Sequence, residues 1–521
     1  MSSLPSSSVV ALSILVALVV RHLLRKKSDV DVLPSPPASE ATWLYGHEYE
    51  VFEHESNVMY SRWASALGPL YKIKAALFHA DVVVAADHAA VQHIFQYADR
   101  YGQYFASVKS PVFRPPVANL LGKGLVWAEG DDHKKQRRIL APAFSPENLK
   151  GMYDDIVESA EKLESRLVNE VASHNGEATV NIVEATSACT LDIIGRAAFG
   201  HDFGAGRSEE AKAISAAWTK HVNMGLTFGG FIAPHVVQTF PWIVKLPIAT
   251  LQAQGTAKVI VTDLASRIID RGVINEQGKD ILSLLMKAAR DSKNPESDGL
   301  TQSQIVDNIS TFIMVGHETT AGSVNFTLLQ LARHPEIQNK LREEINNAGG
   351  QFTIEELQKL EYLDAVVKEG LRLHPASPHT ERIALEDDVI PLDKPIRTSD
   401  GRTITSLEVK AGQVFQIPFQ TINTNPDVWG PDALEFKPER WLTAAACPPR
   451  ASCRMAGAAS SRSAMARGTA LATASVMLAA IIRSIVVEPT GDVVKQVISP
   501  TLQAIVDGKA QLPLRVKSVQ Q

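Results

Sequence analysis

The chain has 521 residues, 45% of them hydrophobic, with 52 basic and 57 acidic side chains and a formal net charge of −5. That charge excludes a nucleic-acid binder that works through bulk positive charge. The composition excludes a disordered, collagen-like or polytopic membrane chain. Three cysteines, Cys189, Cys447 and Cys453, are too few for a disulfide scaffold, so we expect a reducing, cytosol-facing compartment.

The first segment is apolar. Val9 to Val20 is an apolar run in which Ser13 is the one polar residue; no Lys or Arg precedes it, and Arg25-Lys26-Lys27 follows it. A secretory signal peptide carries its charge before the run, whereas here the positive-inside rule leaves the rest of the chain on the cytoplasmic side. Residues 1–27 are therefore predicted to be a signal anchor, with an amphipathic or cleaved leader as the alternative. Residues 28–50, which include Leu33-Pro34-Ser35-Pro36-Pro37, are predicted to be a stiff hinge.

From about residue 50 to residue 440 the pattern is mostly helical. Apolar residues recur at i, i+3 and i+4 in Met152–Glu170, Ser303–Arg333 and Ile354–Leu373. The β-branched pieces Asp81–Ala86 and Val389–Ile396 predict a small sheet. The sequence has no repeat of solenoid period, no glycine-rich phosphate loop and no clean Rossmann fingerprint, so we do not expect it to hold a nicotinamide or a flavin itself.

The segment Thr301–Arg333 predicts a helix of roughly thirty residues, about 45–50 Å long, which must cross the middle of a domain. At its centre lie Gly316-His317-Glu318-Thr319-Thr320. Acid and hydroxyl groups in an apolar helix are costly unless they are paired. A threonine there can bond the carbonyl of the preceding turn and open the helix locally. These residues alone leave a second interpretation open, a kink whose polar groups are satisfied in the core.

Three charged segments flank this helix in the sequence. Glu369 and Arg372 lie at i, i+3 on one predicted helix face, and Arg440 follows in Phe436-Lys437-Pro438-Glu439-Arg440-Trp441. Upstream, His133 and Arg137 lie at i, i+4, which suits an anionic group lying against the helix. Each segment alone is weak evidence, because surface pairs of this kind are common and contribute little. The basic run alone is typical of a solvated face.

In this order and at these separations, the segments together resemble a cytochrome P450. The resemblance rests on the Gly-His-Glu-Thr-Thr helix, the Glu-x-x-Arg helix about 50 residues later, the Phe-x-Pro-Glu-Arg segment about 70 residues after that, and Trp429-Gly430-Pro431-Asp432-Ala433. It is a likeness to membrane-anchored haem-thiolate monooxygenases of eukaryotes, fungal ones in particular. It covers about residues 30–442 and returns more faintly after 480. It implies a mainly α fold with small β-sheets, in which a long central helix lies over a buried haem within residues 51–521.

The resemblance also implies roles for residues of the central helix. Thr319 would hold the water that protonates dioxygen, and Glu318 would relay protons, since cleaving the O–O bond takes protons in a pocket otherwise kept dry. Val315 departs from the Ala or Gly usual at its position and is expected to crowd the oxygen pocket.

Outside the central helix, the resemblance implies structural and cofactor-binding roles. Glu369, Arg372 and Arg440 match the family's structural ion triad. His133, Arg137 and Arg382 match positions that neutralise the propionates of haem b.

The family likeness further implies partners and a location. Electrons would come from NADPH through a separate NADPH–cytochrome P450 reductase, which would dock on outward-facing Lys134 and Lys135. The other expected partners are O2, membrane lipid and a small apolar substrate, with no nucleic acid and with the catalytic domain on the cytosolic side of the endoplasmic reticulum membrane. The apolar segments Phe105–Leu121 and Met224–Ile232 are expected to line the substrate pocket, and they fit terpenoid, polyketide or fatty substrates equally.

The sequence departs from the family at the iron ligand. In the family a cysteine thiolate binds the iron from a Phe-x-x-Gly-x-Arg-x-Cys-x-Gly loop some 20–30 residues past the Pro-Glu-Arg segment. No such loop exists here, so no metal ligand is assigned. Cys447 and Cys453 lie too close to Arg440 and lack the flanking glycines and arginine, and Cys189 sits in a helical core pattern. Within the predicted domain, residues 450–480 are therefore disrupted.

The composition of this region suggests a displaced reading frame. Residues 451–480 hold 11 alanines and five serines but no Asp, Glu or Lys, and no aromatic residue follows Trp441. Joining the last base of each codon to the first two of the next restores the loop: the Met465/Ala466 junction must read Gly, and the other four junctions can read Phe (Arg462/Ser463), Arg (Arg467/Gly468), Cys (Thr469/Ala470) and Gly (Leu471/Ala472). Chance matches are easy in an alanine-rich stretch, but the Phe and the forced Gly are harder to obtain by accident. The displacement would begin near Arg450 and end past Ser475.

Three hypotheses follow. The first is a haem-thiolate monooxygenase of specialised metabolism, active in its native frame. The second takes the chain literally, as a membrane-anchored, haem-poor pseudoenzyme whose pocket at most sequesters lipid-like ligands. The third, a soluble helical-bundle binding protein, leaves the pairing of Glu-x-x-Arg with Pro-Glu-Arg unexplained.

Overall fold

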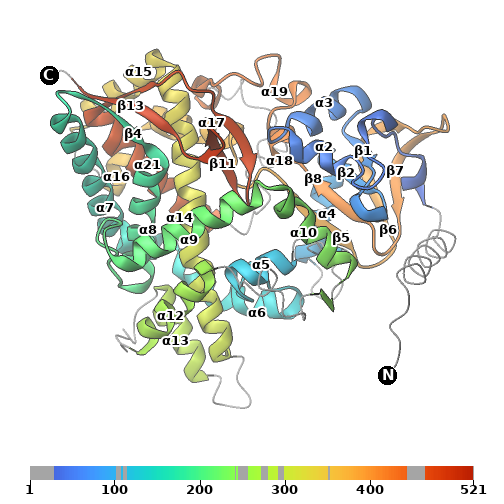
Figure 1. Cartoon of the computed structure of the whole chain (residues 1–521), viewed down its shortest axis with the longest axis horizontal. Helices are drawn as coiled ribbons and strands as arrows, with labels where there is room; N and C mark the ends of the chain where they lie inside the picture. The colour runs from blue at the N-terminus through green and yellow to red at the C-terminus, as the bar shows by residue number, and fades with distance from the viewer. Residues whose placement is uncertain are drawn as a thin grey trace, which may run out of the picture. The chain divides into compact units, whose positions relative to one another are not determined.

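The structure is a computed structural model (Figure 1) that describes residues 28–100, 107–108, 114–240, 242–243, 256–270, 280–291, 299–349, 353–442 and 464–519. The chain divides into two compact units. The first consists of residues up to 53, residues 59–110 and residues 381–417. The second consists of residues 54–58, 111–380 and 418–521. The fold is mainly helical with small sheets, as the sequence predicted.

The first unit is built on a five-stranded sheet of order β1-β2-β8-β5-β3. Its strands are β1 (Leu70–Ile73), β2 (Val82–Ala85), β3 (Ser107–Val108), β5 (Thr380–Ala384) and β8 (Val414–Ile417), and β6 (Asp388–Arg397) and β7 (Thr403–Val409) form a separate hairpin. Its helices are η1 (Asp29–Val32), η2 (Ala38–Glu40), α2 (Glu48–Glu53), α3 (Val58–Leu67), η3 (Ala76–Phe78) and α4 (His88–Arg100). Every residue of β2 is buried, as expected of an apolar strand with neighbours on both sides. The strands predicted at 81–86 and 389–396 are confirmed as β2 and β6.

The segment predicted as a hinge, residues 28–50, belongs to the first unit. Val30 and Leu33 are 0% and 1% exposed. The side chain of Lys72 donates to the carbonyl of Asp31 over 2.9 Å, and the backbone N–H of Lys72 donates to the carbonyl of Pro34 over the same distance. In the structure this proline-rich stretch is therefore packed against β1 rather than extended as a free spacer.

The second unit is a set of helices around one long helix, α14 (Gln302–Arg333). Before α14 come α5 (Arg114–Leu121), α6 (Gly130–Leu140), η4 (Ala141–Phe144), α7 (Pro146–Ser173), α8 (Ile182–Phe199), α9 (Glu209–Gly225), α10 (Phe228–Thr239), α12 (Thr256–Asp270) and α13 (Ile281–Asp291). After it come α15 (Pro335–Asn347), α16 (Ile354–Leu357), α17 (Glu361–Leu373), α18 (Phe419–Asn423), α19 (Pro426–Trp429), η6 (Pro438–Trp441) and α21 (Ala464–Ser484). The helix predicted at 152–170 is confirmed as part of α7.

Helix α14 begins and runs as the sequence predicted. Thr301 caps it, because its hydroxyl accepts from the N–H of Gln304 while the Gln304 side chain accepts from the N–H of Thr301. The helix is continuous to Arg333 and packs along α8, with α12, α17 and α21 as further neighbours (Figure 1). Gly316 permits the close approach of α8, since a Cβ there would lie 2.9 Å from Cγ1 of Ile194. The opening of the helix that the central threonines allowed is not seen.

The prediction of a single helix over Ile354–Leu373 was wrong. The structure has α16 and then α17, separated at Leu360, whose φ and ψ of −80° and 83° are not helical. The cause lies on α15: the carboxylate of Glu344 accepts the N–H groups of Tyr362 and Leu363 over 2.8 and 2.9 Å. A side chain from another helix thus satisfies the first N–H groups of α17, which lets a new helix begin there.

Two small sheets complete the second unit. One has the order β4-β13-β9, with β4 (Glu177–Asn181), β9 (Ile485–Pro489) and β13 (Pro513–Ser518), and the other has the order β10-β11-β12, with β10 (Lys495–Ile498), β11 (Leu502–Val506) and β12 (Lys509–Ala510). Helix α21 leads directly into β9, and its residues from Val476 to Ile482 are each 0% exposed. These residues belong to the main core, together with apolar residues of α7, α8, α14, α15 and α17.

In the part of the chain that the structure describes, no helix combines the length and the apolar character needed to cross a bilayer. The predicted anchor, residues 1–27, lies outside the described residues.

Candidate active site

Helix α14 presents two different environments at its centre. Phe312, Val315, Thr319 and Gly322 form a partly exposed stripe on a helix whose other central residues are mostly buried. The hydroxyl of Thr319 donates to the carbonyl of Val315 over 2.7 Å, which is the bond to the preceding turn that the sequence suggested. The stripe is therefore mainly apolar, and its one hydroxyl group is hydrogen-bonded to the helix backbone.

Glu318 lies on another face of the same helix, turned toward α8. It is 6% exposed, and its Oε1 accepts from the hydroxyl of Ser187 over 3.2 Å and lies 3.3 Å from Nε2 of His317. Glu318 and Thr319 are thus neighbours along the chain whose side chains enter different surroundings. The sequence predicts roles for Glu318 and Thr319 but none for Ser187, and the sole signal for His317 is its position inside the Gly-His-Glu-Thr-Thr motif.

Helix α6 is fixed to α14 by two side-chain hydrogen bonds. Gln304 donates to Asp132 over 2.8 Å, and Asn308 donates to Gln136 over 2.9 Å. The two acceptors are four residues apart on α6 and the two donors are four residues apart on α14, so the two helix faces match over one full turn. His133 and Arg137 are partly buried on the adjoining face of α6. Both residues lie on one helix, one turn apart, in the same unit as Thr319.

Arg382 lies in the first unit, on β5. Its Nη1 donates to the carbonyl of Glu381 over 2.7 Å, and its guanidinium lies 5.0 Å from the centre of the Phe95 ring. The three residues predicted to neutralise the haem propionates therefore belong to different units, Arg382 to the first and His133 and Arg137 to the second.

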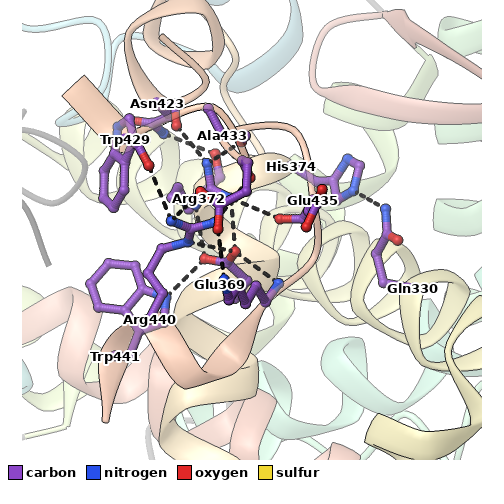
Figure 2. A network of polar contacts seen from close by, with 12 residues as sticks. Gln330, Glu369, Arg372, His374, Asn423, Trp429, Ala433, Glu435, Arg440 and Trp441 are labelled. Carbon is purple, nitrogen blue, oxygen red and sulfur yellow. Dashed lines mark hydrogen bonds and ion pairs between the residues drawn. The ribbon is translucent and has the colours of Figure 1, made fainter. Parts of the chain in front are cut away.

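The predicted ion triad is assembled in the second unit (Figure 2). Arg372 meets Glu369 through two hydrogen bonds of 2.8 and 2.7 Å, and Nε of Arg440 donates to the same carboxylate over 3.2 Å. Trp441 adds its indole N–H to Glu369 over 2.9 Å. The three charged side chains are 0–4% exposed.

The remaining donors of Arg372 are also satisfied (Figure 2). They reach the backbone carbonyls of Asn423, Ala433 and Glu435 over 2.8, 2.6 and 3.1 Å. With the two bonds to Glu369, all five N–H groups of the guanidinium have partners. The group therefore ties α17 to the segment between α18 and η6, which is a structural role.

A second carboxylate balances the charge of the triad. Asp432 accepts from Lys437 over 2.8 Å and from Arg440 over 3.2 Å. These hydrogen bonds, with that of Lys437 the stronger, lower the pKa of Asp432 to about 2. Arg372 and Arg440 thus face Glu369 and Asp432, and Lys437 adds a half-exposed cation beside Asp432.

The chain matches the family model of cytochrome P450 over residues 34–457. It is 32% identical over 428 residues to cytochrome P450 monooxygenase 205 of Postia placenta, which covers 78% of this chain and 76% of that protein. It is 30% identical over 422 residues to cytochrome P450 monooxygenase claP of Ampulloclitocybe clavipes, with the same coverage, and 29% identical to ganoderic acid synthetase CYP5150L8 of Ganoderma lucidum over 84% of both chains. The chain belongs to the cytochrome P450 family. Its enzyme class is accordingly that of a monooxygenase, an oxidoreductase that incorporates molecular oxygen.

P450 enzymes use haem. The described residues of this chain fit one face of that group, but they do not provide the iron ligand on its other face. The partly exposed stripe on α14 would suit a flat apolar group, with Thr319 beside it. The donor set fails on the other side: Cys189, the cysteine within the described residues, is 4% exposed and donates its thiol to the carbonyl of Ser159 over 3.4 Å. Burial raises the pKa of this thiol far above its usual range, so it is a packing residue rather than a thiolate.

The other two cysteines, Cys447 and Cys453, lie outside the described residues, as does the start of the predicted frame displacement near Arg450. Neither cysteine has the sequence surroundings of the family's ligand. Within the described residues, therefore, no side chain supplies the thiolate that a P450 haem requires.

The two segments predicted to line the substrate pocket are only partly described. Within Phe105–Leu121 the structure describes Ser107–Val108 and α5, and Met224–Ile232 spans the end of α9 and the start of α10. Met224 and Phe228 are 48% and 46% exposed, whereas Phe231 is 9% exposed. The second segment therefore offers apolar side chains at the surface of the second unit.

Proposed function

We propose that the native product of this gene is a P450 that inserts one oxygen atom of O2 into an apolar substrate, with electrons from NADPH delivered by a separate reductase. Family membership supports the reaction type, and the assembled ion triad supports a P450 framework around α14 and α17. One relative is named for the synthesis of a particular compound, ganoderic acid, which favours a biosynthetic role here. The apolar run Val9–Val20, followed by Arg21 and by Arg25-Lys26-Lys27, supports anchoring at the endoplasmic reticulum membrane with the catalytic domain in the cytosol.

The observation that carries the proposal is that native-like packing lies on both sides of the missing loop. Upstream, Arg440 and Trp441 bond to Glu369. Downstream, α21 is buried from Thr473 to Ile482, apart from the partly exposed Ser475. A displaced frame would rarely yield a core helix that meets specific partners.

The end of α21 has such partners. Nε and Nη2 of Arg342 donate to the carbonyls of Ile482 and Ile485 over 2.9 and 3.0 Å, where a cation is favourable beside a helix C-terminus. Glu164 accepts hydrogen bonds from Arg483 and Ser484. We infer that the displacement lies within residues 442–472, so it ends earlier than the sequence alone suggested.

The test is the transcript sequence between the codons for Trp441 and Arg483. The proposal expects a base change, or a different exon edge, that restores Phe-x-x-Gly-x-Arg-x-Cys-x-Gly with the cysteine near residue 470. A transcript that encodes the printed residues would overturn it.

The missing loop also favours a second candidate. If the printed residues are native, the protein is a P450 fold without its iron ligand, and its apolar pocket at most sequesters lipid-like ligands.

A further inference from the structure

His317 and Glu318 open on a cavity that Thr319 does not line. The cavity has a volume of about 430 Å³ and lies among α7, α8, α9, α14 and the β11–β12 strands. His317 and Glu318 are 2% and 6% exposed, and Ser187 and Trp218 line the cavity beside them. A cavity of this size with polar groups in its lining has room for several water molecules.

The hydrogen positions in the pair follow from its contacts. Nδ1 of His317 lies 3.0 Å from the carbonyl oxygen of Ile313. A carbonyl only accepts, so Nδ1 carries a hydrogen. In a neutral imidazole, Nε2 would then present a lone pair to Oε1 of Glu318, which lies 3.3 Å away. The contact is favourable only when one more proton is present, either on Nε2 or on the carboxyl group.

We propose that His317 and Glu318 hold one proton between them and exchange it with solvent in the cavity, so that His317 stores the proton that Glu318 passes on. The proton on Nε2 moves to Oε1 of Glu318, which leaves His317 neutral with its hydrogen on Nδ1. Glu318 then gives this proton to a water molecule and becomes a carboxylate again, and a hydronium ion in the cavity gives a proton to Nε2, so the pair once more holds one proton. His317 is thus a positioning residue that acts through Glu318. The inference rests on the proposed function, because the relay role of Glu318 is the one that the resemblance to a cytochrome P450 implies.

The other charged groups around the cavity lie toward its rim. Arg166 on α7 and Glu184 on α8 pair over 3.0 Å with 45% and 64% of their side chains exposed. Lys212 on α9 is 60% exposed and pairs with Glu209 over 2.9 Å. Among the described lining residues, Glu184 is the other carboxylate besides Glu318. These half-exposed pairs are screened by solvent, so they influence the buried pair weakly.

Two histidine rings lie close to the ring of Trp218. The His317 ring meets it edge-on with centroids 5.6 Å apart, and the His221 ring lies 6.3 Å away. Burial lowers the pKa of His221. A protonated imidazole quenches indole emission and a neutral one does so less, so the fluorescence of Trp218 reports the charge of its neighbours. Matched variants of the two histidines separate their effects.

The experiment is a pH titration of tryptophan fluorescence on the full chain, with the Trp218→Phe variant subtracted to isolate Trp218. As the pH is raised, we expect the emission of Trp218 to rise in one transition. This transition should be absent from the His317→Gln variant and present in the His221→Gln variant. Glu318→Gln should shift the midpoint to a proton concentration at least about tenfold higher, because the imidazolium loses its carboxylate. Ser187→Ala should shift it in the opposite direction, because the carboxylate loses a donor.

Two outcomes would overturn the inference: a transition that follows His221, or one that neither Glu318→Gln nor Ser187→Ala moves. Should Glu318→Gln fail to fold, Ser187→Ala decides alone. The titration needs no haem. Its failure therefore leaves the proposed function standing, and failure of the transcript test leaves the titration interpretable.

Discussion

Glu369 and Arg372 form a two-fold hydrogen-bonded ion pair in which neither side chain has any solvent exposure. Burying such a pair costs desolvation free energy. Removing one partner destabilises the fold further, because the remaining buried charge can no longer be solvated. Its stability depends on Arg440, Trp441 and three backbone carbonyls, which satisfy the atoms that the pair leaves over. The pair therefore links α17 to the chain just before the missing loop.

The first prediction concerns this pair. Arg372→Leu should lower the free energy of unfolding by about 3–5 kcal/mol, because Glu369 would be left buried without its main partner. The measurement is urea denaturation followed by circular dichroism. The matched control is Lys368→Leu on the same helix, whose pair with Asp364 is half exposed, and it should change stability by less than about 0.5 kcal/mol. Equal losses in the two variants would contradict the structural role of the pair.

The second prediction concerns acid stability. Burial lowers the pKa of His374 to about 4. The neutral ring donates to Gln496 through Nδ1, accepts from Gln330 at Nε2 (Figure 2) and stacks on Phe326. Since the folded pKa is below the ordinary value, the unfolded chain binds the proton first, and this stability is lost as the pH falls from about 6.5 to 4.

The loss from His374 should reach about 3 kcal/mol. It is measured as the difference in unfolding free energy between the wild type and His374→Gln at a series of pH values. That difference should shrink steadily below pH 6.5. A difference that is constant down to pH 4 would show that His374 is not held neutral.

The third prediction concerns the start of α17. Glu344→Ala should cost about 1–2 kcal/mol, because two N–H groups lose their shared acceptor. Glu343→Ala, at the exposed neighbouring position, should cost less than about 0.5 kcal/mol. Thermal unfolding of the two variants checks this. A fully tolerated Glu344→Ala would mean that the break at Leu360 has another cause.

The fourth prediction concerns Val315, which lies on the partly exposed stripe beside Thr319. In a chain with the cysteine loop restored, Val315→Ala should change the product distribution from a panel of apolar substrates, because it removes two methyl groups from the pocket. Val306→Ala, more than two turns away on α14, is the control. If the two variants give the wild-type products, Val315 does not line the pocket.

Much of the framework was predictable from local patterns. The apolar length of α14, its Thr301 cap and the spacing of Glu369, Arg372 and Arg440 are properties of short segments, and the structure brings the triad together. The break between α16 and α17 was not predictable, because its cause, Glu344, lies on a different helix. The orientation of Glu318 toward Ser187 and the matched pairs of Asp132 and Gln136 with Gln304 and Asn308 likewise depend on which helices pack together. The local sequence of a helix does not indicate which side chains of the neighbouring helices will contact it.

The most direct test of the account is the absorption spectrum of the reduced, carbon-monoxide-bound protein, recorded for the printed chain and for one with residues 442–472 read in the restored frame. Only a thiolate-ligated haem gives the red-shifted Soret band. We expect this band for the restored chain and none for the printed chain. A band from the printed chain, or a folded, haem-loaded restored chain without it, would contradict the account.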